Sequence, residues 1–320
     1  MNKNDIQFNR DPIGHKALLK SGKQNANATT TNQQLFHGPN YIPTPSTYLS
    51  APSKLINMPQ NYNLPSLATL ERIDLGCKEY FFGLPIPGGN RKNTRPSFTY
   101  ITHAKVCQLE KDHVPLICKM VNEYFEPFYK LDPTTKKFVL HQFFVKYHML
   151  ECIYQTYRMD AFLPKNSYIV FNGYILDEND KGAIVSHAPI RHEVLQSLAN
   201  MLKHTAACKK SIERLEIDDL EKAAMAGVLI WQEVASAAPL WSEATEAQEK
   251  ILSELHAHAL QKVGIAKAGS RIGALMSIIN EVEAIARVFL ERETMEKVFD
   301  SKFVDTWETV EPYIFFFEFV

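Results

Sequence analysis

Hydrophobic residues recur at spacings of three and four along nearly the whole second half of the chain. Such a period places apolar side chains on one face of an α-helix. One short segment departs from it: Tyr168–Phe171 and Tyr174–Leu176 flank Asn172-Gly173, a pairing typical of a tight β-hairpin. Helices with one isolated hairpin, and no alternation of strands and helices, predict a layered all-α domain.

Helix boundaries can be placed by start signals and by period. A first helix is expected from Ser66 through Leu75, and another along Val114–Phe128. Asp132-Pro133 has an N-cap residue followed by proline, which predicts a helix start. The helix that follows carries apolar residues on more than one face, including Phe138, so we expect it in the middle of the domain. Four later helices are expected over 190–209, 218–236, 243–263 and 267–298. For the third of these, Thr245 with Gln248 could form a capping box, and Ser242 is an equally good start.

Composition excludes several classes of protein. The formal net charge is -1, so no overall field attracts the chain to DNA or to an anionic membrane. The longest apolar stretch before the C-terminus, Ala223–Trp231, is too short to span a bilayer. Five cysteines without Cys-x-x-Cys spacing predict free thiols in a reducing compartment, with neither a zinc site nor a disulfide framework. Residues 18–65 are rich in polar residues and proline, which predicts a flexible linker.

No pattern in the sequence indicates catalysis. The chain has no phosphate-binding loop, dinucleotide fingerprint, His-Glu-x-x-His or nucleophile elbow. The loop over residues 87–92 holds two glycines and two basic residues, but no helix start or strand frames it as a phosphate site. His256 and His258 lie two positions apart on an expected helix, so their rings point in different directions and cannot share a metal ion. We therefore predict that the chain is not an enzyme.

Three stretches, taken in order, resemble the ligand-binding domain of nuclear hormone receptors, most closely the divergent nematode family. Met120–Arg158 resembles the third to fifth helices of that family, and the hairpin follows where the family has its small sheet. Ile217–Trp231 is similar to the eighth helix, and Ser270–Met276 to the start of the long tenth helix. The resemblance covers roughly residues 65–320.

The resemblance implies a three-layer antiparallel helical sandwich with one small β-hairpin over residues 65–320. Residues 1–64 would be a flexible hinge and the remnant that follows a DNA-binding domain, because Asp5–Asp11 resembles the segment after the second zinc module. The two four-cysteine zinc modules are not in this sequence, so no zinc is expected and DNA would be reached through a missing domain or a partner. The family implies the nucleus, with the cytoplasm left open.

The resemblance also implies a structural pair. In the family, an acidic residue on the eighth helix and an arginine at the start of the tenth support each other, which corresponds here to Glu221 and Arg271. The alternative is that each is an ordinary solvated charge. The long tenth helix often carries the dimer face, so homodimers or heterodimers with other receptors are expected.

The C-terminus fits the activation-helix pattern of two apolar residues, any residue, glutamate and two apolar residues. Glu318 would cap a coactivator or corepressor helix of the Leu-x-x-Leu-Leu type, while its apolar neighbours dock the helix over a pocket; the matching residues are Phe315, Phe316, Glu318, Phe319 and Val320. The alternative is an apolar plug packed into the core. The family's lysine at the other end of that groove is replaced by Glu123, so Lys119 or Lys136 would have to substitute.

A ligand pocket is implied by the same resemblance. Its residues would be Ile117, Met120, Met149, Cys152, Gln155, Arg158 and Phe171. Gln155 stands where the family often has an arginine, so a fatty-acid anion would be held less firmly, and a neutral lipid or the chain's own aromatic rings could fill the space. The expected function is transcription regulation gated by an apolar small molecule. The alternative is a ligand-independent dimerisation module that titrates other receptors.

Overall fold

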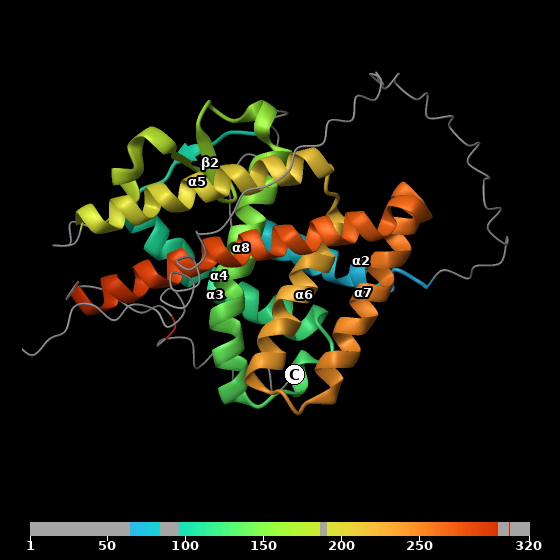
Figure 1. The fold of residues 1–320 in the computed structure, drawn as a ribbon. Coiled ribbons are helices and arrows are strands. Elements are labelled where there is room, and N and C mark those ends of the chain that lie inside the picture. Colours follow the sequence, from blue (N-terminus) through green and yellow to red (C-terminus); the bar gives the residue numbers. More distant parts are fainter. Residues whose placement is uncertain (1–64, 84–95, 186–190, 300–306, 308–320) are drawn as a thin grey trace, which may run out of the picture. The chain divides into compact units, whose positions relative to one another are not determined.

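The structure is a computed structural model, and it describes residues 65–83, 96–185, 191–299 and Trp307. Within these residues the chain is helical apart from one small sheet (Figure 1). The elements are α2 (Ala68–Phe82), β1 (Thr99–Tyr100), α3 (His103–Tyr124), η1 (Phe128–Lys130), α4 (Pro133–Arg158), η2 (Asp160–Phe162), β2 (Ser167–Phe171), β3 (Tyr174–Asp177), η3 (Glu178–Ile184), α5 (Arg191–Leu215), α6 (Asp219–Ala237), α7 (Ser242–Val263) and α8 (Ile265–Phe299).

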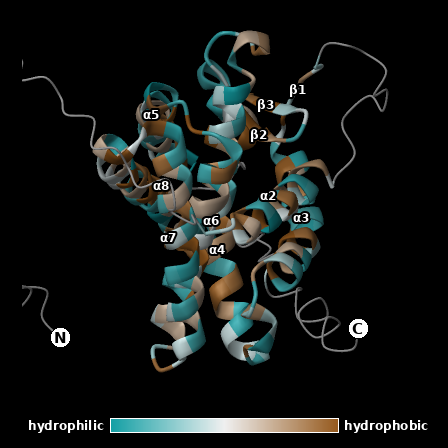
Figure 2. Ribbon diagram, turned by 90° about the vertical axis from the view of Figure 1, so that its right-hand side faces the viewer, coloured by the Kyte–Doolittle hydropathy of each residue, from teal (hydrophilic) through white to brown (hydrophobic). Residues whose placement is uncertain are grey.

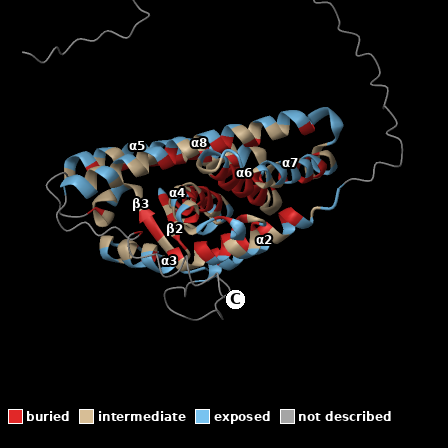
Figure 3. Ribbon diagram, turned by 90° about the horizontal axis from the view of Figure 1, so that it is seen from below, coloured by how far each residue is buried: buried red, intermediate tan, exposed pale blue. Residues whose placement is uncertain are grey.

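The helices form three layers. In Figure 3, α4 and α6 lie between α2 and α3 on one side and α5 and α8 on the other, and buried residues concentrate on this middle pair. Helix α7 packs against α6, α8 and α2. The predicted three-layer helical sandwich is confirmed, and α4 occupies the middle position expected for it. One of its apolar residues, Phe138, is 56% exposed, on the outward side of the first turns.

The small sheet has three strands in the order β1-β3-β2. Strands β2 and β3 pair antiparallel around Asn172-Gly173, as the sequence predicted, and Gly173 adopts a positive φ of 79° that suits the tight turn. Strand β1 adds in parallel, pairing Thr99 with Tyr174. Two residues carry too little pattern to signal a strand, so the sequence did not predict β1. Figure 2 shows hydrophobic residues along β2 and β3, which face the helices.

Side-chain caps fix where the middle-layer helices begin. The Asp132 carboxylate accepts a hydrogen bond from the Thr135 amide, which confirms the predicted start of α4. Asp218 and Glu221 form a reciprocal capping box at the start of α6. Helix α7 begins at Ser242, so the predicted capping box at Thr245 is wrong: that residue lies inside the first turn, where its amide already belongs to the helix.

A distant residue caps α2. The buried Glu254 carboxylate on α7 accepts hydrogen bonds from the amides of Thr69 and Leu70, at 2.9 and 3.0 Å. A negative charge at a helix N-terminus satisfies free amides and complements the helix dipole. This contact joins an outer-layer helix to α7 across 185 residues of sequence. None of the described helices is long and apolar enough to cross a membrane.

Candidate functional site

A cavity of about 260 Å³ lies beside α4, enclosed by α3, the sheet, η3, α5 and the C-terminal part of α8. Such a volume can hold a small organic molecule, and apolar walls with a few polar groups are typical of ligand sites. The walls are mostly aliphatic and aromatic. The apolar lining residues are Val106, Val114, Phe144, Val145, Met149, Ile153, Tyr168, Ile169, Val170, Phe171, Leu176, Ile184, Met201, Leu202, Phe289 and Trp307.

His148 extends this apolar wall as a neutral ring, and it packs near a second neutral histidine, His113, which does not line the cavity. His148 stacks on Phe144 at 5.7 Å between centroids, and both His148 and His113 lie 4.8 Å from the Phe171 ring. Burial, together with the neighbouring His113, lowers the pKa of His148 to about 3. Burial likewise lowers the pKa of His113 to about 4, although a hydrogen bond with the Leu109 carbonyl opposes this. At neutral pH neither ring offers a charge to a ligand.

Cys152 also lines the cavity from α4. Its thiol donates a hydrogen bond to the Val170 carbonyl at 3.0 Å, which ties the helix to β2. Burial, together with the charge of Glu151, raises the pKa of this thiol. A protonated, hydrogen-bonded thiol is a poor nucleophile, so its contribution here is packing.

One end of the cavity is charged. Glu110 on α3 lies near Arg292, Glu293 and Glu296 on α8, and all four line the cavity. The Arg292 Nε lies 3.8 Å from a Glu296 carboxylate oxygen, and its guanidinium lies 4.4 Å from the centre of the Phe289 ring. Burial, opposed by the charge of Arg292 and assisted by Glu293 and Glu296, raises the pKa of Glu110 to about 7.

The structure places three of the seven predicted pocket residues in this wall: Met149, Cys152 and Phe171. The other four do not line it. Ile117 and Met120 belong to the main core, and they lie on α3 beyond Val114, the last residue of that helix that lines the cavity. Their assignment to the pocket is therefore corrected.

Gln155 and Arg158 also lie away from the cavity. Gln155 donates to the Glu151 carboxylate one turn earlier, at 2.7 Å. Arg158 donates to the Tyr154 hydroxyl and to Asp219 at the start of α6. The predicted polar end of the pocket at these residues is replaced by the α3–α8 group. That group was not found from the sequence, because Glu110 and Arg292 are 182 positions apart and each resembles an ordinary solvated charge; the i, i+4 pair Arg292–Glu296 was the one local signal.

Glu221 and Arg271 lie in direct contact, in a cluster apart from the cavity. The Glu221 carboxylate is fully buried and accepts hydrogen bonds from Arg271 Nε and Nη2, and from Lys262 Nζ at 2.9 Å. Arg271 Nη2 also donates to the Leu215 carbonyl at 2.9 Å. The arginine therefore ties the start of α8 to the α5–α6 connection.

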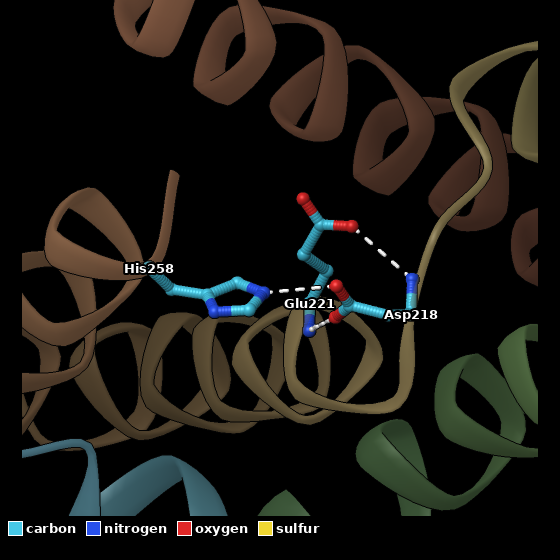
Figure 4. Close-up of side chains that lie close together, drawn as sticks. All are labelled: Asp218, Glu221 and His258. Carbon is cyan, nitrogen blue, oxygen red and sulfur yellow. Dashed lines mark hydrogen bonds and ion pairs between the residues drawn. The ribbon is translucent and has the colours of Figure 1, made fainter. Parts of the chain in front are cut away.

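Asp218, Glu221 and His258 come close enough together to suggest a cation site (Figure 4). His258 Nε2 lies 2.9 Å from the Asp218 carboxylate, and Lys262 Nζ lies 2.6 Å from it. Burial tends to raise the pKa of Asp218, but the hydrogen bonds from His258 and Lys262 lower it well below its usual value. With Lys262 and Arg271 on the carboxylates, their charge is already compensated, and the arrangement fits a structural ion-pair network better than a metal site.

The structure describes only two of the residues predicted to form the coactivator groove, Lys119 and Lys136. Phe315, Phe316, Glu318, Phe319 and Val320 lie outside the described residues. Lys119 is exposed on α3, 3.4 Å from Glu79 and 3.8 Å from Glu123. Lys136 is only 3% exposed, so in this conformation its ammonium is not presented at the surface as a clamp would require.

A second cavity of about 560 Å³ lies between α2, η1 and α7. Four of its charged residues form two ion pairs: Arg72 with Glu126 at 2.8 Å, and Lys130 with Glu243 at 3.0 Å. Because these charges are satisfied within the protein and the lining is largely polar, the cavity beside α4 is the better candidate for an apolar ligand.

Comparison with known proteins agrees with this architecture. The family model described as "Ligand-binding domain of nuclear hormone receptor" matches residues 91–299. Among solved structures, the Ultraspiracle ligand binding domain from Drosophila melanogaster superposes with a TM-score of 0.55 at 10% identity, covering 77% of this chain and 96% of that one. No curated protein sequence matches this chain.

Proposed function

Because the chain belongs to the nuclear hormone receptor family and carries its ligand-binding domain, we propose that it binds an apolar small molecule in the cavity beside α4. The family regulates transcription and is not enzymatic, so the function of this chain is receptor-type transcription regulation. The observation that carries the ligand proposal is the cavity of about 260 Å³ with its predominantly apolar lining.

The proposal extends to how ligand and coregulator are coupled. A bound ligand would shift the population of conformations in which the C-terminal segment around Glu318 is docked. Trp307 supports a link to the cavity, because it is buried, lines the cavity, and packs edge-on against Phe144 at 5.4 Å. A ligand against that ring would act on the chain leading to the C-terminus.

The partners that we propose for this chain are those of nuclear receptor ligand-binding domains in general. Nuclear receptor ligand-binding domains dimerise with other receptors and bind coregulators, and the family acts in the nucleus. For this chain we propose Leu-x-x-Leu-Leu-type helices as the coregulator motif, a homodimer or a receptor heterodimer, and DNA contact through a partner or a separate domain. We also keep the expectation that this chain binds no zinc.

Two measurements test the proposal. Mass spectrometry of lipids extracted from the purified full chain should detect one apolar molecule per protein, whereas an empty protein that still dimerises would favour the ligand-independent module. Separately, Glu318→Lys should abolish binding of a Leu-x-x-Leu-Leu peptide while changing the thermal midpoint little. Unchanged peptide affinity would remove Glu318 from the coregulator site.

A further inference from the structure

The charged end of the cavity carries more negative than positive charge. Three carboxylates line it, on Glu110, Glu293 and Glu296. Of the described residues, two cations line the same cavity: Lys111, which is exposed to solvent, and Arg292. The side chains of Arg292, Glu293 and Glu296 are only 14%, 21% and 15% exposed. These charges therefore act in a partly desolvated setting, where electrostatic interactions exceed those in water.

The pairing at this end leaves Glu110 without a close counter-charge. Arg292 contacts Glu296, and Glu293 lies 3.9 Å from His141 Nε2. In the described part of the chain, Glu110 has no ion pair within 4 Å, although it lies on the cavity wall. A partly buried carboxylate in this position is stabilised by a donor that carries positive charge.

Away from Lys111 and the charged end, the cavity offers little to an anion. The His148 ring is neutral at neutral pH, and the other polar lining residues there, His103, Cys107, Cys152 and Thr205, lie among hydrocarbon and aromatic walls. A carboxylic acid placed here would bring further negative charge to the acidic end or lose its hydration against apolar walls. An alcohol could donate one hydrogen bond but would not offset the charge.

Resting on the proposed function of this cavity, we propose that its ligand is a cationic amphiphile: an apolar body bearing a protonated amine, which pairs with Glu110 at the α3–α8 end. The apolar body lies along Phe144, Met149 and Phe171. This reverses the expectation of a lipid acid anchored by an arginine, because Arg158 lies outside the cavity and Arg292, which lines it, lies among three carboxylates.

Three probes that share one tail isolate the head group: dodecylamine, dodecanol and dodecanoate. Isothermal titration of the full chain at neutral pH should show the amine binding at least about tenfold more tightly than the alcohol, with dodecanoate weakest. Glu110→Gln should weaken amine binding by about tenfold or more and leave the affinity for the alcohol unchanged. Glu291→Gln is the matched control, because Glu291 is exposed on α8 and does not line the cavity.

The outcomes separate this inference from the proposed function. Dodecanoate binding as tightly as the amine, or Glu110→Gln leaving amine affinity within twofold, would overturn the cationic ligand while the cavity stays a ligand site. Amine binding that Glu291→Gln weakens equally would also overturn it, because the attraction would then be to the acidic surface. If none of the three probes binds, the proposed function fails together with the inference.

Discussion

Replacing Arg271 by alanine should destabilise the domain far more than the loss of a surface charge would. Arg271 holds the fully buried Glu221 carboxylate with two hydrogen bonds and donates a third to the Leu215 carbonyl. Removing one partner of a buried ion pair typically costs about 3–5 kcal/mol, because the other charge is left buried and uncompensated. Since Lys262 still contacts Glu221, we expect the lower end, about 3 kcal/mol.

This loss can be measured by urea unfolding and by the thermal midpoint. For a domain of this size, about 3 kcal/mol corresponds to a decrease of roughly 6–12 °C in the thermal midpoint. Arg287→Ala is the matched control, since Arg287 is exposed on the same helix, and it should change stability by less than about 0.5 kcal/mol.

A double-mutant cycle refines the same prediction. Glu221→Gln removes the buried charge, so adding Arg271→Ala to it should cost much less than Arg271→Ala costs in the parent chain. If Arg271→Ala lowers the free energy of unfolding by less than about 1 kcal/mol, or if the two changes are additive, Glu221 is not the residue that the arginine neutralises.

Two further predictions concern pH and packing. The folded-state pKa values of His113 and His148 lie below the usual 6.5, so their contribution to the free energy of unfolding should be constant well above that pH and be lost as pH drops from 6.5 toward 4. His148→Phe should reduce this slope in urea titrations, and an unchanged slope would show that the ring is not buried in its neutral form. Gly76→Ala should destabilise by about 1–3 kcal/mol, because the new Cβ would lie 2.6 Å from the Tyr124 ring. At Gly273 a new Cβ would have no atom within 4 Å, so Gly273→Ala should stabilise the domain by about 0.5–1 kcal/mol. Thermal unfolding measures both variants, and equal effects of Gly76→Ala and Gly273→Ala would contradict the close packing of Gly76 against Tyr124.

Much of the fold could be predicted from local pattern. The Asp132-Pro133 start and the Asn172-Gly173 turn each specify backbone geometry through neighbouring residues, and the structure has both. Contacts between distant segments could not be predicted in this way. The capping of α2 by Glu254 and the pairing of β1 with β3 depend on how the layers meet, which no local period records.

The candidate site, too, could be predicted only in part from the sequence. Of the residues expected to line a ligand pocket, Met149, Cys152 and Phe171 line this cavity. Ile117 and Gln155 do not, because the resemblance does not fix how far along each helix the cavity extends: its lining ends at Val114 on α3 and at Ile153 on α4. The polar end of the cavity comes from a contact between α3 and α8, and therefore required coordinates.

The central claim is that the space beside α4 is a ligand site, and blocking it tests this most directly. Val106 is half-buried and lines the cavity, whereas Leu195 is similarly buried on α5 and does not. Native mass spectrometry of the full chain with an apolar probe such as dodecylamine should show a one-to-one complex that Val106→Trp abolishes and Leu195→Trp retains. A complex that survives Val106→Trp, in a variant that is folded by circular dichroism, would contradict the account.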